Sequence, residues 1–155
     1  MSFIAVQPSP PSSGAVIKNS PFWPDVDLAQ MREAVRLDGT VTEPKLQHAV
    51  TNAIIQINLD LAPWRLRQQA AGYEALQQVP ADLVNEQSVY VSLYFRAVYC
   101  WAKANLIERY ADFDSTAKGA KDAEDQNNTI TDLYRDARFA IRDILGVSHV
   151  TAELI

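Results

Sequence analysis

The sequence is poor in the residues from which most catalytic and metal sites are built. It has one cysteine, two histidines and five glycines in 155 residues. The single cysteine, Cys100, excludes an internal disulfide and suits a reducing compartment. His48 and His149 lie far apart and fit no metal-binding spacing, and the glycines form no phosphate-binding loop. We therefore expect no enzyme activity, no metal and no cofactor.

Long apolar runs and an excess of positive charge are missing too. No stretch approaches the roughly 20 residues of a transmembrane helix, and the first residues lack the basic and apolar parts of a secretory signal. We expect a soluble protein made in the cytoplasm, with no membrane contact. The formal net charge of −5 argues against tight binding to a phosphate backbone, which depends on clustered lysine and arginine.

Apolar residues, by contrast, are abundant. They make up 48% of the chain, enough for the core of one domain. Residues 88–110 contain neither glycine nor proline and are apolar on most sides at helical spacing. We predict a central helix here, with a narrow polar strip formed by Ser92, Arg96 and Lys103. Cys100 falls on the apolar side, where we expect a buried small side chain.

Two shorter amphipathic segments precede the central helix. The first should begin at Asp25 or Asp27, either of which can cap a helix N-terminus, and should end at a turn at Gly39. The second should begin near Thr42 and run until Pro63, which should kink or end it. Residues 72–86 then form a connector that can hold one helical turn, and the central helix should start near its end.

A last helix follows residues 111–125, which we expect to be an acidic loop. Its apolar side chains recur on one face, and Gly146 sits where a helix-ending glycine belongs. The sequence thus predicts an all-α fold. In it, residues 25–146 form a bundle of about four helices around the long central helix.

Extended ends flank this bundle. Residues 1–24 are rich in proline and serine and predict an extended arm that ends in Phe22 and Trp23. These aromatics have two interpretations: a staple that packs the arm on its own domain, which we favour, or an anchor on a neighbouring subunit. Residues 147–155 form a β-competent tail, which predicts strand addition to a partner or a tail lying on its own helices. The tail residues that would dock are Val147, His149, Val150, Thr151, Ala152, Glu153, Leu154 and Ile155.

Charged residues gather in two places. The last helix interleaves acids and arginines outside its apolar face, which favours a solvated or subunit-facing ion-pair surface over a DNA-binding ridge. These residues are Asp132, Arg135, Asp136, Arg138, Arg142 and Asp143. The expected loop before that helix contributes Asp112, Asp114, Asp122, Glu124 and Asp125.

Taken in order, several stretches resemble the head completion (head stabilisation) proteins of contractile-tailed phages. The match covers most of the chain beyond the arm, and Pro63 is a local departure from it. The stretches are Phe22-Trp23-Pro24-Asp25-Val26-Asp27, Asp38-Gly39-Thr40-Val41-Thr42, Ala71-Gly72-Tyr73, Tyr94-Phe95-Arg96-Ala97-Val98-Tyr99, Glu108-Arg109-Tyr110, Asp112-Phe113-Asp114-Ser115-Thr116, Arg135-Asp136-Ala137-Arg138-Phe139-Ala140-Ile141-Arg142-Asp143-Ile144-Leu145-Gly146 and Val150-Thr151-Ala152-Glu153-Leu154-Ile155.

The resemblance implies a structural head–tail connector of the virion, assembled in the host cytoplasm. Such proteins dock under the portal after the genome is packaged, form a ring of the portal's dodecameric symmetry, keep DNA from leaking and support the neck and tail-terminator proteins. In such a ring, arginine–aspartate pairs of the last helix would join subunits. The acidic residues would repel passing double-stranded DNA, and the tail would dock on the portal. The alternative is a small helical DNA-binding or regulatory protein, against which the acidic composition speaks.

Overall fold

The computed structural model describes residues 14–37, 39–110 and 117–149, and its elements are mostly helical. In chain order they are β1 (Val16–Ile17), β2 (Val26–Asp27), α1 (Leu28–Ala34), α2 (Glu43–Asp60), α3 (Ala62–Ala70), the 3₁₀ turn η1 (Leu76–Gln78), β3 (Leu83–Val84), β4 (Gln87–Ser88), α4 (Val89–Tyr110) and α5 (Ala117–Leu145). Strands β1 and β2 pair antiparallel, as do β3 and β4. The all-α prediction is confirmed in outline.

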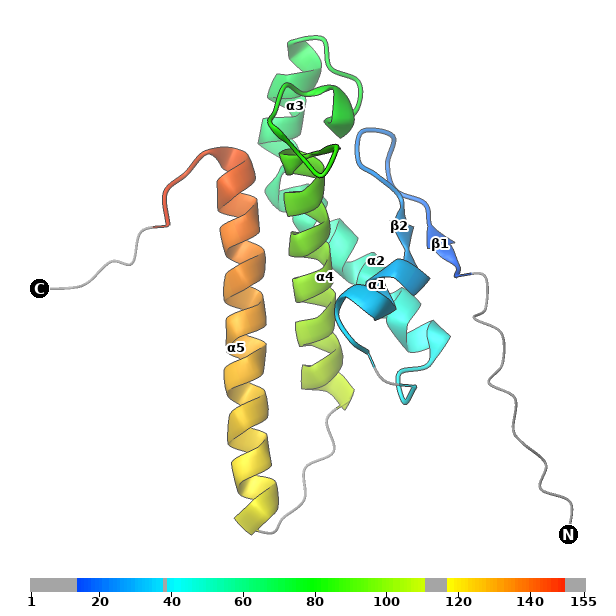
Figure 1. Cartoon of the computed structure of the whole chain (residues 1–155), viewed down its shortest axis with the longest axis vertical. Coiled ribbons are helices and arrows are strands. Elements are labelled where there is room, and N and C mark those ends of the chain that lie inside the picture. The colour runs from blue at the N-terminus through cyan, green and yellow to red at the C-terminus, as the bar shows by residue number, and fades with distance from the viewer. Residues whose placement is uncertain (1–13, 38, 111–116, 150–155) are drawn as a thin grey trace, which may run out of the picture.

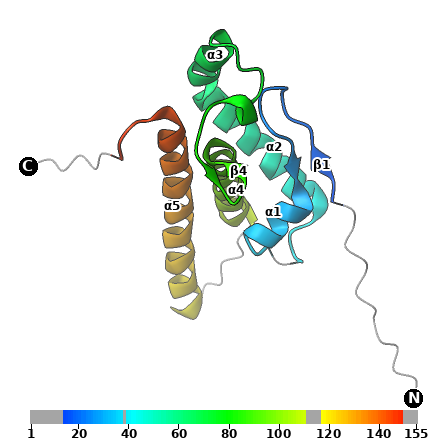
Figure 2. The same ribbon diagram turned by 45° about the horizontal axis from the view of Figure 1, so that its top comes forward.

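Helix α4 is central, as predicted, but the arrangement around it is more open than a bundle. Helix α5 runs antiparallel along one side of α4, and α2 crosses α4 on another face (Figure 1). Within the described residues α5 packs almost entirely on α4, so its opposite side faces solvent (Figure 2). The two small sheets, which the sequence did not predict, tie the chain before α1 and before α4.

The first two predicted helices form close to their expected bounds. Asp27 caps α1, and its Oδ1 accepts hydrogen bonds from the backbone N–H groups of Ala29 and Gln30 at 2.8 and 3.1 Å. The helix ends at Ala34, a turn earlier than predicted, because Arg36 takes a left-handed conformation with φ of 52°. Pro63 acts as predicted: α2 ends at Asp60, and the proline stands in the first turn of α3.

The predicted start of the central helix is wrong by about one turn. Asn85 and Glu86 have φ of 52° and 62° and form the two-residue turn between β3 and β4, as hairpins with two positive-φ residues do. The helix therefore begins only at Val89. The strands escaped prediction because each has two residues and β3 is exposed on both. The helical turn expected in the connector is η1.

The expected acidic loop is also partly wrong. Helix α5 already begins at Ala117, so Asp122, Glu124 and Asp125 lie on a helix. The acidic, small residues of this segment suggested a loop, but its alanines, lysines and glutamate favour a helix. At the other end Gly146, with φ of 71°, ends the helix as predicted.

The core lies between α4, α2 and the segment before α1. Tyr94 of α4 is fully buried, and its ring stacks on Trp23 at 4.8 Å between centroids. Leu28, Leu46 and Ile57 close the same core from α1 and α2. Cys100 departs from its prediction because it is only partly buried and lines a cleft on the polar strip of α4.

Candidate interaction surfaces

The segment before α1 is clamped to the domain by a closed set of side-chain hydrogen bonds. Asn19 donates to the Tyr94 hydroxyl at 2.7 Å, Tyr94 donates to the Asn58 amide oxygen at 2.7 Å, and Asn58 donates back to Asn19 at 2.9 Å. Burial raises the pKa of the Tyr94 phenol far above its usual range, so the hydroxyl stays protonated and keeps both bonds. Asn19 also receives support from Asp25, which accepts from its backbone N–H at 2.9 Å.

Phe22 and Trp23 complete this clamp through packing. They are 2% and 4% exposed, and Phe22 meets Trp23 edge-on at 4.8 Å. Trp64 of α3 lies 6.3 Å from both rings. The two aromatics are thus covered by their own chain, as the staple interpretation expects, and offer almost no surface to a neighbouring subunit. Residues 1–13 lie outside the described residues.

Some of the charges on α5 are paired within the chain. Arg135 contacts Asp132 at 2.9 Å and Asp136 at 3.4 Å, and Asp136 also faces Arg96 of α4 at 3.9 Å. All of these side chains keep access to solvent, so the pairs contribute little to stability. Arg138 is exposed and has no side-chain partner among the described residues. These ion pairs form within one chain, and the role of these arginines and aspartates between subunits stays a prediction.

The tail turns back on α5 at its first residues. The His149 ring stacks on Phe139 with centroids 4.1 Å apart, and its Nε2 lies 2.7 Å from the Asp143 carboxylate. Arg142 donates to the Ser148 carbonyl at 3.0 Å. Val147 is half exposed beside them. The other docking candidates, Val150, Thr151, Ala152, Glu153, Leu154 and Ile155, lie outside the described residues.

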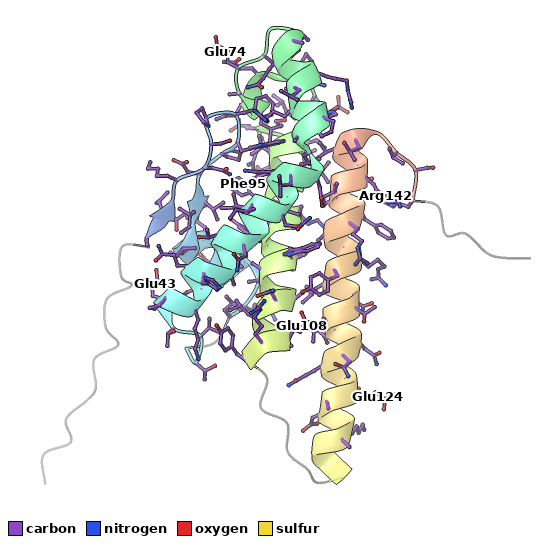
Figure 3. The ribbon with its side chains drawn as sticks, turned by 180° about the vertical axis from the view of Figure 1, so that it is seen from behind. Glu43, Glu74, Phe95, Glu108, Glu124 and Arg142 are labelled. Atoms are coloured by element: carbon purple, nitrogen blue, oxygen red, sulfur yellow. The ribbon has the colours of Figure 1, made fainter. Side chains whose placement is uncertain are left out.

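The described acidic candidates lie on one half of a helix. Asp122, Glu124 and Asp125 are all exposed near the start of α5, and at about 100° per residue they fall within an arc of about 160° around its axis. Figure 3 shows Glu124 on the part of α5 that runs past the end of α4. They make the early part of this helix acidic. Asp112 and Asp114 lie outside the described residues.

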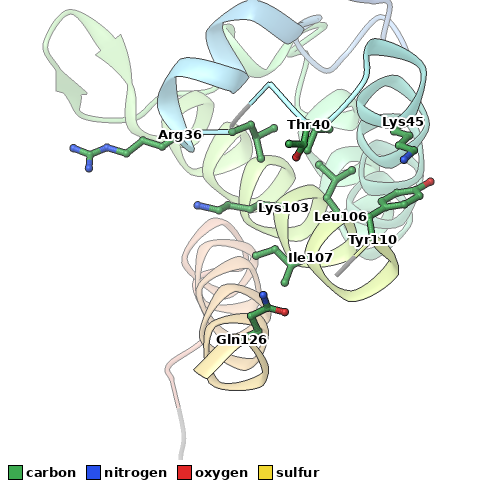
Figure 4. Close-up of a pocket in the computed structure, with 10 residues that line it drawn as sticks. Arg36, Thr40, Lys45, Lys103, Leu106, Ile107, Tyr110 and Gln126 are labelled. Atoms are coloured by element: carbon green, nitrogen blue, oxygen red, sulfur yellow. The ribbon is translucent and has the colours of Figure 1, made fainter. Parts of the chain in front are cut away.

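A cleft of about 460 Å³ opens where the α1–α2 connection, the end of α4 and α5 meet (Figure 4). Three cations line it, but they do not converge. Lys103 donates to the Val35 carbonyl at 2.7 Å, and the Lys45 ammonium lies 4.5 Å above the Tyr110 ring. Figure 4 shows Arg36 pointing away from Lys45. The three cations therefore do not gather around one point at which an anion could bind.

A second cleft, of about 520 Å³, follows the polar strip of α4 between α1 and β4. Phe95, Tyr99 and Cys100 contribute apolar lining, and Ser92 and Arg96 lie with them. Burial raises the pKa of the Cys100 thiol, with Asp136 adding to the effect, so the thiol is a poor nucleophile at neutral pH. The polar strip meets solvent as predicted, without any catalytic arrangement among the residues that line this cleft.

Two exposed apolar groups went unnoticed in the sequence. Ile55, Leu59 and Leu66 lie on α2 and α3, and Leu83 and Val84 form β3, all more than half exposed. The i, i+4 spacing of Ile55 and Leu59 was a readable signal, but the stronger stripe of buried residues on the same helix obscured it.

The described ranges contain neither a metal-binding cluster nor a membrane-spanning helix. Residues 14–37, 39–110 and 117–149 contain no group of three or more histidine, cysteine, aspartate or glutamate side chains placed to hold a metal ion. No helix in these ranges is long and apolar enough to cross a bilayer.

Comparison with known proteins finds similarity to phage head completion proteins. The family of phage head completion proteins (GPL) matches residues 17–155. The head completion/stabilization protein of Escherichia phage P2 is 40% identical over 141 residues, which cover 91% of this chain and 83% of that protein. The probable head completion/stabilization protein of Haemophilus phage HP1 is 24% identical over 134 residues, covering 84% of this chain and 86% of the relative. No solved structure matches significantly.

Proposed function

Because the chain belongs to the phage head completion protein family, we propose that it is a structural connector between head and tail. In this role it docks under the portal once the genome is packaged, forms a ring there and stabilises the filled head. The ring is the platform for the neck and tail-terminator proteins. Family membership associates the chain with the virion; the ring, its dodecameric symmetry and the portal contact are the steps proposed here.

The observation that carries the proposal is the exposure of α5. This helix spans Ala117–Leu145, and within the described residues it packs almost entirely on α4. Its other side presents charged side chains and Phe139 to solvent, with His149 folded over the ring. A long helix covered on one side is suited to an assembly subunit, because neighbouring chains can pack on the remaining face.

The charge distribution suits a channel through which DNA passes. The chain carries a formal net charge of −5, and Asp122, Glu124 and Asp125 are exposed at one end of α5. Acidic groups facing a lumen repel the phosphate backbone, so the genome slides instead of binding. The arginines and aspartates of α5 are proposed as polar contacts to neighbouring chains, with Arg138 still unpaired among the described side chains.

Electron microscopy of the protein mixed with purified portal tests the proposal. We expect a ring of added density on one face of the portal, with one copy of the chain per portal subunit. Portal particles without added density at saturating protein concentration would contradict it. Tight and salt-sensitive DNA binding by the free protein would instead favour a DNA-binding regulator.

A further inference from the structure

Two exposed apolar surfaces stand out on this chain, one on α2–α3 and one on the β3–β4 hairpin. The helix stripe consists of Ile55, Leu59 and Leu66, which are 54%, 65% and 57% exposed. The hairpin patch consists of Leu83 and Val84, which are 68% and 64% exposed. Grouped apolar side chains of this kind mark interaction surfaces more often than scattered ones do.

The helix stripe is continuous although it crosses the junction of two helices. Helical hydrogen bonding continues on both sides of Leu61, which donates to Ile57 at 3.0 Å and accepts from Arg65 at 2.9 Å. Leu59 lies four residues after Ile55, and Leu66 lies seven residues after Leu59. These spacings place all three side chains on one side of α2 and α3. The buried residues of α2, such as Ile57, face the core, so the stripe points away from it.

The hairpin patch is held in a fixed shape. Asn85 and Glu86 form its two-residue turn, and its base is tied to α4 by a hydrogen bond from the Val89 N–H to the Asp82 carbonyl at 3.0 Å. A rigid projection loses little conformational entropy when it packs on another surface.

Charges of opposite sign lie beside parts of the two surfaces. Asp82 and Glu86 flank the hairpin patch, and Arg65 and Arg67 flank the stripe next to Leu66. Asp60, beside Leu59, is acidic and accepts a hydrogen bond from Gln56 at 3.0 Å. The side chains of Asp82, Glu86 and Arg67 are exposed and have no partner within the described ranges. Complementary charge around an apolar centre favours one partner and one orientation.

The two surfaces lie on opposite faces of the molecule. Figure 1 shows the hairpin in front of the first turns of α4 and α2 behind that helix, and Figure 3, from behind, shows α2 in front. Two complementary surfaces on different faces of one chain can only pair between copies in a head-to-tail sense. Such heterologous contacts close into rings when the rotation between copies permits it.

We propose that the hairpin patch of one copy packs on the helix stripe of the next copy, with Asp82 and Glu86 meeting Arg65 and Arg67. This inference rests on the proposed ring and specifies which surfaces form it. The contact centres on five apolar side chains, whereas a standard interface uses about 20–30 residues a side. Free copies therefore associate weakly, and the ring forms where a partner holds many copies together.

Cysteine cross-linking tests the contact directly in the full-length chain. In a Cys100→Ala background, we would prepare Leu59→Cys, Val84→Cys and the double variant. Each single variant alone should give no cross-link, because stripe meets hairpin and neither meets itself. An equal mixture of the two single variants should give dimers, and the double variant should give a ladder of multimers. Each would be oxidised both as concentrated free protein and on purified portal.

The outcomes separate this contact from the connector function. A ring on the portal without a ladder would overturn the contact and leave the function standing. A ladder without any ring on the portal would support the contact and count against the function. Absence of both would reject both.

A charge swap supplies a second and independent measurement. Arg67→Glu and Glu86→Arg alone should each reduce cross-linking in the cysteine background at least several-fold, and combining them should restore it, because the reversed pair forms between copies. Arg109→Glu makes the same charge change as Arg67→Glu at the exposed end of α4, outside both surfaces, and should leave cross-linking unchanged. Equal loss in the combined variant would contradict the pairing of these two surfaces.

Discussion

Asn19, Asn58 and Tyr94 show how single residues set the shape of this chain. The three side chains donate to one another in a closed cycle, and they join the segment before α1 to α2 and α4. Sequence patterns predicted an extended arm ending in packed aromatics. They gave no sign of the cycle, because its members come from three separate elements and none belongs to a local motif.

At the residue scale, Tyr94→Phe should destabilise the domain by about 1–3 kcal/mol, because it leaves Asn58 and Asn19 partly buried without their partner. Chemical denaturation followed by circular dichroism would measure the loss. Tyr134→Phe is the matched control, because that hydroxyl bonds exposed Glu108 and its removal should change the unfolding free energy by less than about 0.5 kcal/mol. Equal effects of the two substitutions would show that the cycle adds no stability.

The helices differ in how well the sequence predicted them. Helices α1, α2 and α4 carry apolar stripes or caps, and Pro63 marks the end of α2, so their positions were predicted to within about a turn. The start of α5 was not, because its first turns depend on helix propensity and not on burial. The hairpin before α4 was missed because a two-residue turn at Asn85 and Glu86 carries no glycine.

At the element scale, we predict that the tail is needed for assembly and dispensable for folding. Deleting residues 150–155 keeps His149 on Phe139 and Asp143, so the helical circular dichroism should stay at the level of the full chain. Binding to purified portal, measured by co-sedimentation, should be lost.

The longer deletion of residues 147–155 serves as its comparison. It also removes the contacts of Val147 and His149 with the end of α5 and should lower the thermal midpoint by a few degrees at most. Normal portal binding by the shorter truncation would rule out the tail as a docking segment.

Seen as a whole, the described part of the molecule is a helical scaffold that exposes charged and apolar side chains on its surface. The clefts lack converging charges, and neither of them lies over a catalytic arrangement among the described residues. Asp122, Glu124 and Asp125 add only three acidic groups per chain near the start of α5, so a repulsive surface toward DNA would arise from many copies together.

At this scale we predict weak DNA binding by the free protein. The net charge of −5 should keep the dissociation constant for duplex DNA at or above the non-specific range of about 10⁻⁴–10⁻⁶ M. Fluorescence anisotropy with a labelled duplex at low salt would measure it. Nanomolar binding that weakens steeply with added salt would contradict a DNA-repelling connector.

By itself the sequence determined the mostly helical fold, the central position of α4, the helix end at Gly146, the break at Pro63 and the family. These depend on local periodicity, on backbone restrictions of single residues and on ordered motifs, all of which can be read along the chain. The sequence left the cap of α1 open between Asp25 and Asp27, and the structure assigns it to Asp27. Only the tertiary structure decided that α5 stays uncovered on one side and that the Asn19–Asn58–Tyr94 cycle closes. It alone placed the hairpin patch and the helix stripe on opposite faces. Those features depend on which distant residues meet, and that is settled by packing in three dimensions.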